Sequence, residues 1–254
     1  MKHPTNPFLA ALRAGKPQIG LWVSLGSNFA AEAVAGAGFD WVLVDMEHAP
    51  NDVQSVLSQL QVFAAYPVTA IVRPPWNDSV MVKRLLDSGA QGLLFPMIQT
   101  PDEAASAIAA CRYPPRGIRG VGGTTRANKF GRVTDYFTKV EDETAILLQV
   151  ETLTAMEQAV EIATTEGVDG VFFGPADIGA DMGHLGQPMH PAVWDAIRPV
   201  AQALIARGIP VGTLVSDADF ARSLINDGFT FVACGADTGL LARAADTLIA
   251  KMRA

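Results

Sequence analysis

Three ionisable residues follow directly on an apolar segment in VLVDMEHAP, residues 42–50. The first three residues suit the interior of a sheet, whereas Asp45, Glu47 and His48 come within the next four positions. Burying such groups at the end of a strand is costly unless each one finds a partner. Their types suit proton transfer and the stabilisation of charge, so this stretch predicts a functional site.

Four further apolar segments also end in polar groups, namely Arg73, Gln149 with Glu151, Pro175-Ala176-Asp177, and Asp237. Glu151 and Asp177 would form a hard, anionic oxygen site that suits Mg²⁺ or Mn²⁺. No lysine ends any of these segments, so a Schiff-base mechanism has no candidate. A metal, an arginine and a histidine together predict proton transfer next to a carbonyl, with the enolate stabilised by both cations.

Each of these residues also has a purely structural interpretation. Arg73 could pair only with Glu47, Asp177 could cap a turn, and Glu151 could cap the helix that follows it. His48 alone could be a satisfied structural residue. Taken together, however, these interpretations need a separate reason for every residue at one shared location, so the site hypothesis is favoured.

Eight apolar segments, each followed by a helical stretch, predict an α/β fold: a (β/α)8 TIM barrel in a single domain over residues 1–254. An extra N-terminal helix is expected at residues 4–14, and a doubly wound open sheet is the alternative architecture. In a closed barrel the carboxyl ends of the strands meet around one mouth, which would bring the polar residues together. The expected strands are residues 19–25, 41–48, 68–74, 92–98, 145–151, 170–177, 210–215 and 231–237.

Helix starts and one long interruption divide this pattern. Thr100, followed by Pro101 and Glu103, predicts a capped helix start, and Thr154 with Glu157 and Ser216 with Asp219 give further capping signals. Residues 112–143 are too Gly-rich and basic for a core, so we expect a lid, a substrate loop or an oligomer contact there.

Composition excludes several classes of function. The net charge of −7 and the absence of a basic stripe argue against nucleic acid as a partner. No run approaches the roughly 18 apolar residues of a membrane span, and the N-terminus lacks the apolar core of a signal peptide. Two cysteines are too few for a disulfide framework, so a cytoplasmic protein is expected. The Gly-rich GVGGTT (120–125) and CGADTG (234–239) match no nucleotide-binding fingerprint.

Several motifs together resemble the HpcH/HpaI family of class II, metal-dependent pyruvate aldolases. They are DMEHAPND, VRPPWND, YPPRGIRGVG, QVET, EGVDGVFFGPADIGADMGHLG and VACGAD, and the resemblance extends from about Gly20 to the last helix. It implies reversible cleavage of 4-hydroxy-2-oxo acids, as in 4-hydroxy-2-oxoheptanedioate aldolases, into pyruvate or hydroxypyruvate and an aldehyde through a metal-stabilised enolate. It also implies that the last helix is exchanged between subunits of a homohexamer built as a trimer of dimers.

The same resemblance implies a role for each site residue. Glu151 and Asp177 would ligate a divalent ion (Mg²⁺, Mn²⁺ or Co²⁺, with Zn²⁺ as an alternative), and Asp177 would also adjoin the substrate. The other implied roles are substrate positioning by Gln149 and the Ala176 backbone, enolate stabilisation by Arg73, a base at His48, support of the adjoining subunit's histidine by Asp87, and an aldehyde pocket at Trp22 and Leu214.

One departure and two alternatives limit this expectation. Many relatives carry arginine after VET, where this chain has Leu153, so aldehyde preference or packing could differ. A CoA-thioester lyase of the citrate lyase β or malyl-CoA type would share the metal carboxylates, but is normally longer. A metal-dependent protein that only binds 2-oxo acids is the non-enzymatic alternative. The sequence does not name the aldehyde, the metal or the preferred donor.

Overall fold

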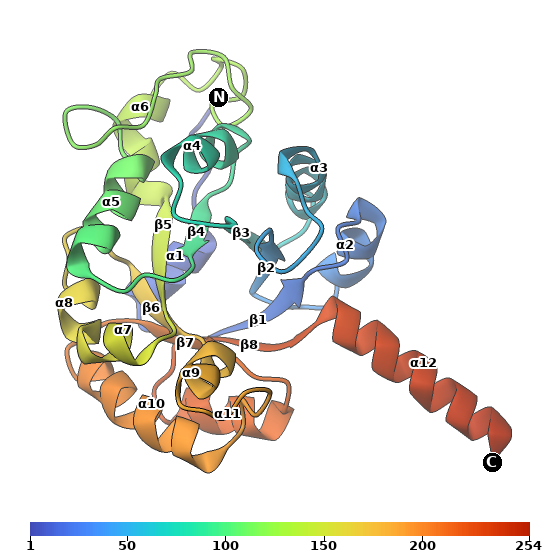
Figure 1. The fold of residues 1–254 in the computed structure, drawn as a ribbon. Coiled ribbons are helices and arrows are strands. Elements are labelled where there is room, and N and C mark those ends of the chain that lie inside the picture. The colour runs from blue at the N-terminus through green and yellow to red at the C-terminus, as the bar shows by residue number, and fades with distance from the viewer.

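Eight parallel strands close into a barrel in the order β1 to β8, as a computed structural model of residues 1–254 shows (Figure 1). The predicted TIM barrel is thereby confirmed, and the open-sheet alternative is wrong. Each strand ends earlier than expected, so Glu47, His48, Glu151, Asp177 and Asp237 lie beyond the ends of their strands. The strands are β1 Gln18–Val23, β2 Trp41–Asp45, β3 Thr69–Arg73, β4 Gly92–Phe95, β5 Ala145–Val150, β6 Gly170–Phe173, β7 Val211–Leu214 and β8 Phe231–Ala236.

Helices surround the barrel and begin largely where polar side chains cap them. Thr100 accepts a hydrogen bond from the Glu103 N–H, as its sequence predicts. The caps predicted at Thr154 and Ser216 are wrong. The helices that follow β5 and β7 are capped instead by Thr152 and Asp217, whose side chains accept hydrogen bonds from first-turn N–H groups. The helices are α1 Pro7–Arg13, α2 Asn28–Ala35, α3 Val53–Phe63, α4 Ser79–Asp87, α5 Pro101–Cys111, α6 Tyr136–Lys139, α7 Leu153–Glu157, α8 Ala159–Ala163, α9 Pro175–Asp181, α10 Pro191–Ile205, α11 Ala218–Asn226 and α12 Asp237–Arg253, with a 3-10 turn η1 at Val140–Glu143.

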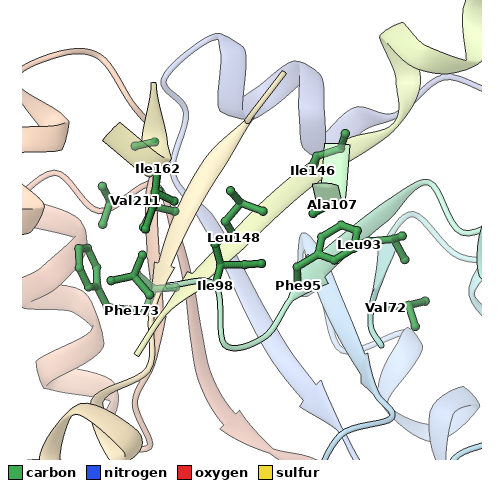
Figure 2. Packing of buried hydrophobic residues seen from close by; sticks show 14 of the residues in the cluster. Val72, Leu93, Phe95, Ile98, Ala107, Ile146, Leu148, Ile162, Phe173 and Val211 are labelled. Atoms are coloured by element: carbon green, nitrogen blue, oxygen red, sulfur yellow. The ribbon is translucent and has the colours of Figure 1, made fainter. Parts of the chain in front are cut away.

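Alternating side chains of the strands build two separate apolar layers. On β5, Ile146 and Leu148 point outward and pack against the helices together with Phe95, Ala107 and Ile162 (Figure 2). The residues between them point inward and fill the barrel. Three buried residues of α1, namely Phe8, Leu9 and Leu12, belong to this inner cluster, so the extra N-terminal helix packs against the barrel interior. The other members are Trp22, Trp41, Leu43, Ile71, Leu94, Ala145, Leu147, Phe172, Phe231 and Ala233.

Two parts of the chain extend from the barrel. Helix α12 projects away from the barrel (Figure 1), and only its first residue is buried. The insertion at residues 112–143 follows α5 and precedes β5, so it lies at the amino-terminal end of the strands, beside the N-terminus. It is therefore not a lid or a substrate loop over the chain's own site, and the oligomer contact stays a prediction. No helix is long and apolar enough to cross a membrane.

Candidate metal and substrate site

Alternation along the strands places the polar residues at the mouth. Leu147 belongs to the inner cluster, so Gln149 and Glu151, two and four positions later, also face inward. The same alternation carries inward from Leu43 to Asp45 and from Ile71 to Arg73. Because all strands are parallel, these side chains converge at one end of the barrel.

Arg73 is fixed by a pair of carboxylates from the neighbouring segment. Asp45 is its register partner on β2, and Arg73 Nε and Nη2 donate to the two Asp45 oxygens at 2.8 Å each. Arg73 Nη1 lies 2.9 Å from Glu47 Oε2, and the guanidinium carbon lies 5.2 Å from the Trp22 ring centre. Burial alone would lower the pKa of Arg73, but the hydrogen bonds and charge of Asp45 and the charge of Glu47 raise it. Arg73 is thus a fixed, permanently charged donor.

Glu151 is a buried carboxylate without a cationic partner. Its Oε1 accepts from the Met97 N–H at 2.6 Å, and its Oε2 accepts from the Gln149 side-chain amide. Met97 adopts a left-handed backbone (φ 53°), an unusual conformation for a side-chain-bearing residue and one that surrounding structure must impose. Burial raises the pKa of Glu151 to about 7, and the negative charges of Asp177 and Glu47 contribute to the rise. A cation at this position would relieve that penalty.

The surroundings of Glu151 fit a divalent ion. A Cβ on Gly174 would lie 2.8 Å from Glu151 Oε2, so glycine keeps that side of the carboxylate open. Gln149 Oε1 is buried without a hydrogen-bond partner. No three His, Cys, Asp or Glu side chains converge as a metal cluster. An ion at Glu151 and Asp177 would therefore complete its coordination with oxygen atoms of water and substrate, as Mg²⁺ commonly does.

A cavity of about 590 Å³ opens beside these residues. Its base is formed by side chains from the ends of β1, β3, β5 and β6, and its outer part by two loops that follow β6 and β7. Ala176 lies in the first turn of α9, which no side chain caps, so its N–H is free to bind an anion. The lining residues are Trp22, His48, Arg73, Gln149, Phe172, Gly174, Pro175, Ala176, Asp177, Pro188, Met189, Leu214, Val215, Ser216 and Asp217.

The structure brings most of the predicted site residues together, with two exceptions. Trp22, His48 and Leu214 line the same cavity as Arg73, and the His48 side chain is 68% exposed, with Nε2 3.9 Å from Glu47 Oε2. Asp237 lies at the carboxyl end of β8, as expected, but it does not line the cavity. Its carboxylate, at the start of α12, accepts from the Ser24, Leu25 and Thr238 N–H groups. That role is structural.

Asp87 is the second exception. It ends α4, which returns from the mouth toward the amino-terminal end of the barrel, and it does not line the cavity. Its Oδ1 accepts from Arg119 Nη2 at 2.9 Å. Sequence reasoning also missed the outer wall at Pro188, Met189 and Ser216, because no spacing indicates which loop residues fold inward.

A closed parallel barrel with an acidic, arginine-containing mouth defines a class of (β/α)8 enzymes in which a metal serves carbonyl chemistry. Comparison with known proteins narrows this class. The HpcH/HpaI aldolase/citrate lyase family model matches residues 18–244, and the chain belongs to that family.

Relatives of known name and structure support the assignment. The chain is 52% identical to the 4-hydroxy-2-oxo-heptane-1,7-dioate aldolase of Escherichia coli over 98% of this chain and 95% of that protein. It is similar to a crystal structure of an HpcH/HpaI aldolase/citrate lyase family protein from Burkholderia cenocepacia (TM-score 0.94, 42% identity, 98% of this chain and 100% of that one). The HpcH/HpaI aldolase from Desulfitobacterium hafniense gives a TM-score of 0.89 at 30% identity, over 96% of this chain and 95% of that one.

The citrate lyase alternative is more distant. The β subunit of citrate lyase from Mycobacterium tuberculosis gives a TM-score of 0.60 at 16% identity, over 90% of this chain and 95% of that one. This likeness shows a common fold and no more.

Proposed function

We propose that this chain is a metal-dependent pyruvate aldolase, which reversibly cleaves 4-hydroxy-2-oxo acids into pyruvate, or hydroxypyruvate, and an aldehyde. The observation that carries the proposal is the buried carboxylate of Glu151, which has no cationic partner. Its Oε2 accepts from the side-chain amide of Gln149, which lines the cavity together with Arg73 and Asp177. Similarity to an aldolase at 52% identity supports it.

Within this proposal Glu151 and Asp177 would hold the divalent ion, which would supply Lewis-acid stabilisation of negative charge. Mg²⁺, Mn²⁺ and Co²⁺ suit two carboxylate ligands, with Zn²⁺ as an alternative. Gln149, whose Oε1 is unpaired, and the free Ala176 N–H orient the 2-oxo acid.

The remaining residues move or balance charge. His48 accepts the proton of the substrate's C4 hydroxyl. The C3–C4 bond then breaks, the electron pair of that bond forms the enolate, and C4 becomes the carbonyl carbon of the aldehyde. Arg73 donates to the oxygen that gains negative charge, and its position is fixed by Asp45 before the reaction begins. The proton that His48 has taken up is then returned to C3, which gives pyruvate and restores the neutral base. Trp22 and Leu214 contact the departing aldehyde.

The position of Asp87 supports action in another subunit. A residue at the opposite end of the barrel cannot reach its own His48, so Asp87 would support the histidine of an adjoining copy. A homohexamer, built as a trimer of dimers with α12 exchanged, would provide that contact and cover the exposed leucines of α12. We also propose a cytoplasmic location, which the two free cysteines support.

Exchange of the pyruvate methyl protons with deuterium tests the function without an aldehyde. After exhaustive chelation the exchange should stop, and added Mg²⁺, Mn²⁺ or Co²⁺ should restore it. Borohydride should trap no substrate on the protein. Full exchange in chelator would contradict the metal-dependent mechanism, and tight pyruvate binding without exchange would indicate a binding protein.

A further inference from the structure

The cavity has two chemically different ends. The inner end carries the polar groups of β3, β5 and β6 that would bind the 2-oxo acid. The outer end is formed by Leu214 and the three residues after it, together with Pro188 and Met189 of the loop before α10. In an aldolase the departing or incoming aldehyde would occupy this outer end, because the 2-oxo end of the substrate fills the inner one.

The lining holds one permanent cation, and that cation is already paired. Arg73 is the only lysine or arginine among the lining residues, and its guanidinium contacts two carboxylates, Asp45 and Glu47. A divalent ion would be balanced by Glu151 and Asp177 and would take up the carboxylate of the 2-oxo acid. A second carboxylate on the substrate would therefore find no free positive charge within this chain.

The outer end instead adds a negative charge. Asp217 begins the connection into α11 and lines the cavity, and its Oδ1 is fixed by the Phe220 N–H at 2.7 Å. The neighbouring side chains are apolar or neutral: Pro188, Met189, Leu214, Val215 and Ser216. A neutral alkyl chain gains from contact with these residues, whereas a carboxylate would lose hydration beside a like charge.

We propose that the outer end selects neutral aldehydes over aldehydes that carry a carboxylate, and that Asp217 is the residue that sets this preference. The inference rests on the proposed aldolase function and names its substrate class. The proposed preference of this chain differs from the dicarboxylate substrate after which its Escherichia coli relative is named.

The test measures the aldol addition of pyruvate to three aldehydes of similar length: butanal, methyl 4-oxobutanoate and 4-oxobutanoate. We expect kcat/KM to be higher for both neutral aldehydes than for 4-oxobutanoate. Asp217→Asn retains a capping oxygen and removes the charge, so it should raise the ratio of 4-oxobutanoate to butanal kcat/KM. Because Asp217 is exposed, the expected change is about two- to fivefold. About 0.5 M salt should raise the same ratio in the unmodified protein and not in Asp217→Asn.

Asp219→Asn is the matched control, since Asp219 lies on α11, is 91% exposed and does not line the cavity. It should leave the ratio unchanged. Preference of the unmodified chain for 4-oxobutanoate would overturn the proposed selectivity, and an unchanged ratio in Asp217→Asn would overturn the role of Asp217. Absence of addition with all three aldehydes would contradict the aldolase function itself, so the two failures are distinguishable.

Discussion

Arg73 shows how a single residue acquires a fixed orientation from its neighbours. Its two hydrogen bonds to Asp45 form a planar fork, and Glu47 pairs with the remaining nitrogen. Removing the side chain would leave two poorly solvated carboxylates without a partner, which typically costs several kcal/mol. A substitution that keeps the charge is therefore the informative one.

Arg73→Lys should lower both aldol turnover and pyruvate proton exchange by about 10²-fold, because an ammonium group cannot reproduce the fork and its donor position. The folded fraction, followed by circular dichroism, should stay unchanged at 25 °C. Arg116→Lys, at a surface arginine paired with Glu141, provides the control and should be neutral. Proton exchange at the original rate in Arg73→Lys would show that Arg73 only supports the structure.

In the metal-free chain the buried carboxylate of Glu151 should lower the free energy of unfolding, although metal binding requires that carboxylate. Its pKa rises from an ordinary value of 4.5 to about 7 on folding, so the folded state binds more protons than the unfolded state between these values. The free energy of unfolding therefore falls as pH rises through this window. Glu151→Gln removes the titratable carboxyl group. The amide of the variant can donate to Gln149 Oε1, which has no hydrogen-bond partner in the unmodified chain.

In chelator at pH 8, Glu151→Gln should accordingly be more stable than the unmodified chain by about 1–3 kcal/mol, and the difference should shrink toward zero at pH 4. Urea unfolding at both pH values measures this, with the exposed Glu157→Gln as a control that shows no such difference. The same Glu151→Gln variant should bind Mn²⁺ more weakly. Equal stability of the two chains at pH 8 would mean that burial does not penalise this carboxylate.

At the scale of elements, the eight apolar segments, each followed by a helical stretch, predicted the most. Gln149 and Glu151 are two residues apart and therefore share one face of their strand, and the parallel order gathers them with Arg73 at one mouth. Contacts between distant segments could not be predicted this way. The Arg73–Asp45 fork depends on register, and the structural role of Asp237 depends on backbone N–H groups of the loop after β1.

The turn between β6 and α9 gives a prediction at this scale. Gly174 has an ordinary backbone conformation (φ −96°), so alanine would bring no backbone strain. Its Cβ would nevertheless lie within 2.9 Å of two Glu151 atoms and displace that carboxylate. Gly174→Ala should weaken Mn²⁺ binding about tenfold or more, consistent with the usual 1–3 kcal/mol cost of overpacking.

Titration calorimetry measures the affinity, and Gly239→Ala is the control, because open space surrounds that position. Mn²⁺ affinity equal to that of the unmodified chain would show that Glu151 does not need its present position to bind an ion.

At the scale of the whole molecule, the direction of the chain decides which segments lie at the barrel mouth and can reach the site. A helix that follows a barrel strand returns to the opposite end, so Asp87 of α4 and the insertion at residues 112–143 lie away from the mouth. Arg119 is itself buried and holds Asp87 in place, which indicates a defined position and not a disordered surface group. Only a second copy can bring this end of the barrel to His48.

Mixing two inactive variants tests this arrangement. His48→Ala should lower turnover by about 10² to 10⁴, because it removes the general base, and Asp87→Asn should lower turnover by weakening that base. If Asp87 acts on the histidine of an adjoining chain, mixed oligomers contain sites with His48 from one variant and Asp87 from the other. Unfolding and refolding an equimolar mixture should therefore restore activity in about one site in four, as random assembly of a symmetric oligomer requires.

Each variant refolded alone should remain inactive, which controls for recovery caused by refolding itself. Light scattering on the mixture should show an assembly and no active monomer. If the mixture has only the mean activity of its two components, Asp87 does not act across subunits, and the salt bridge with Arg119 is then its whole role.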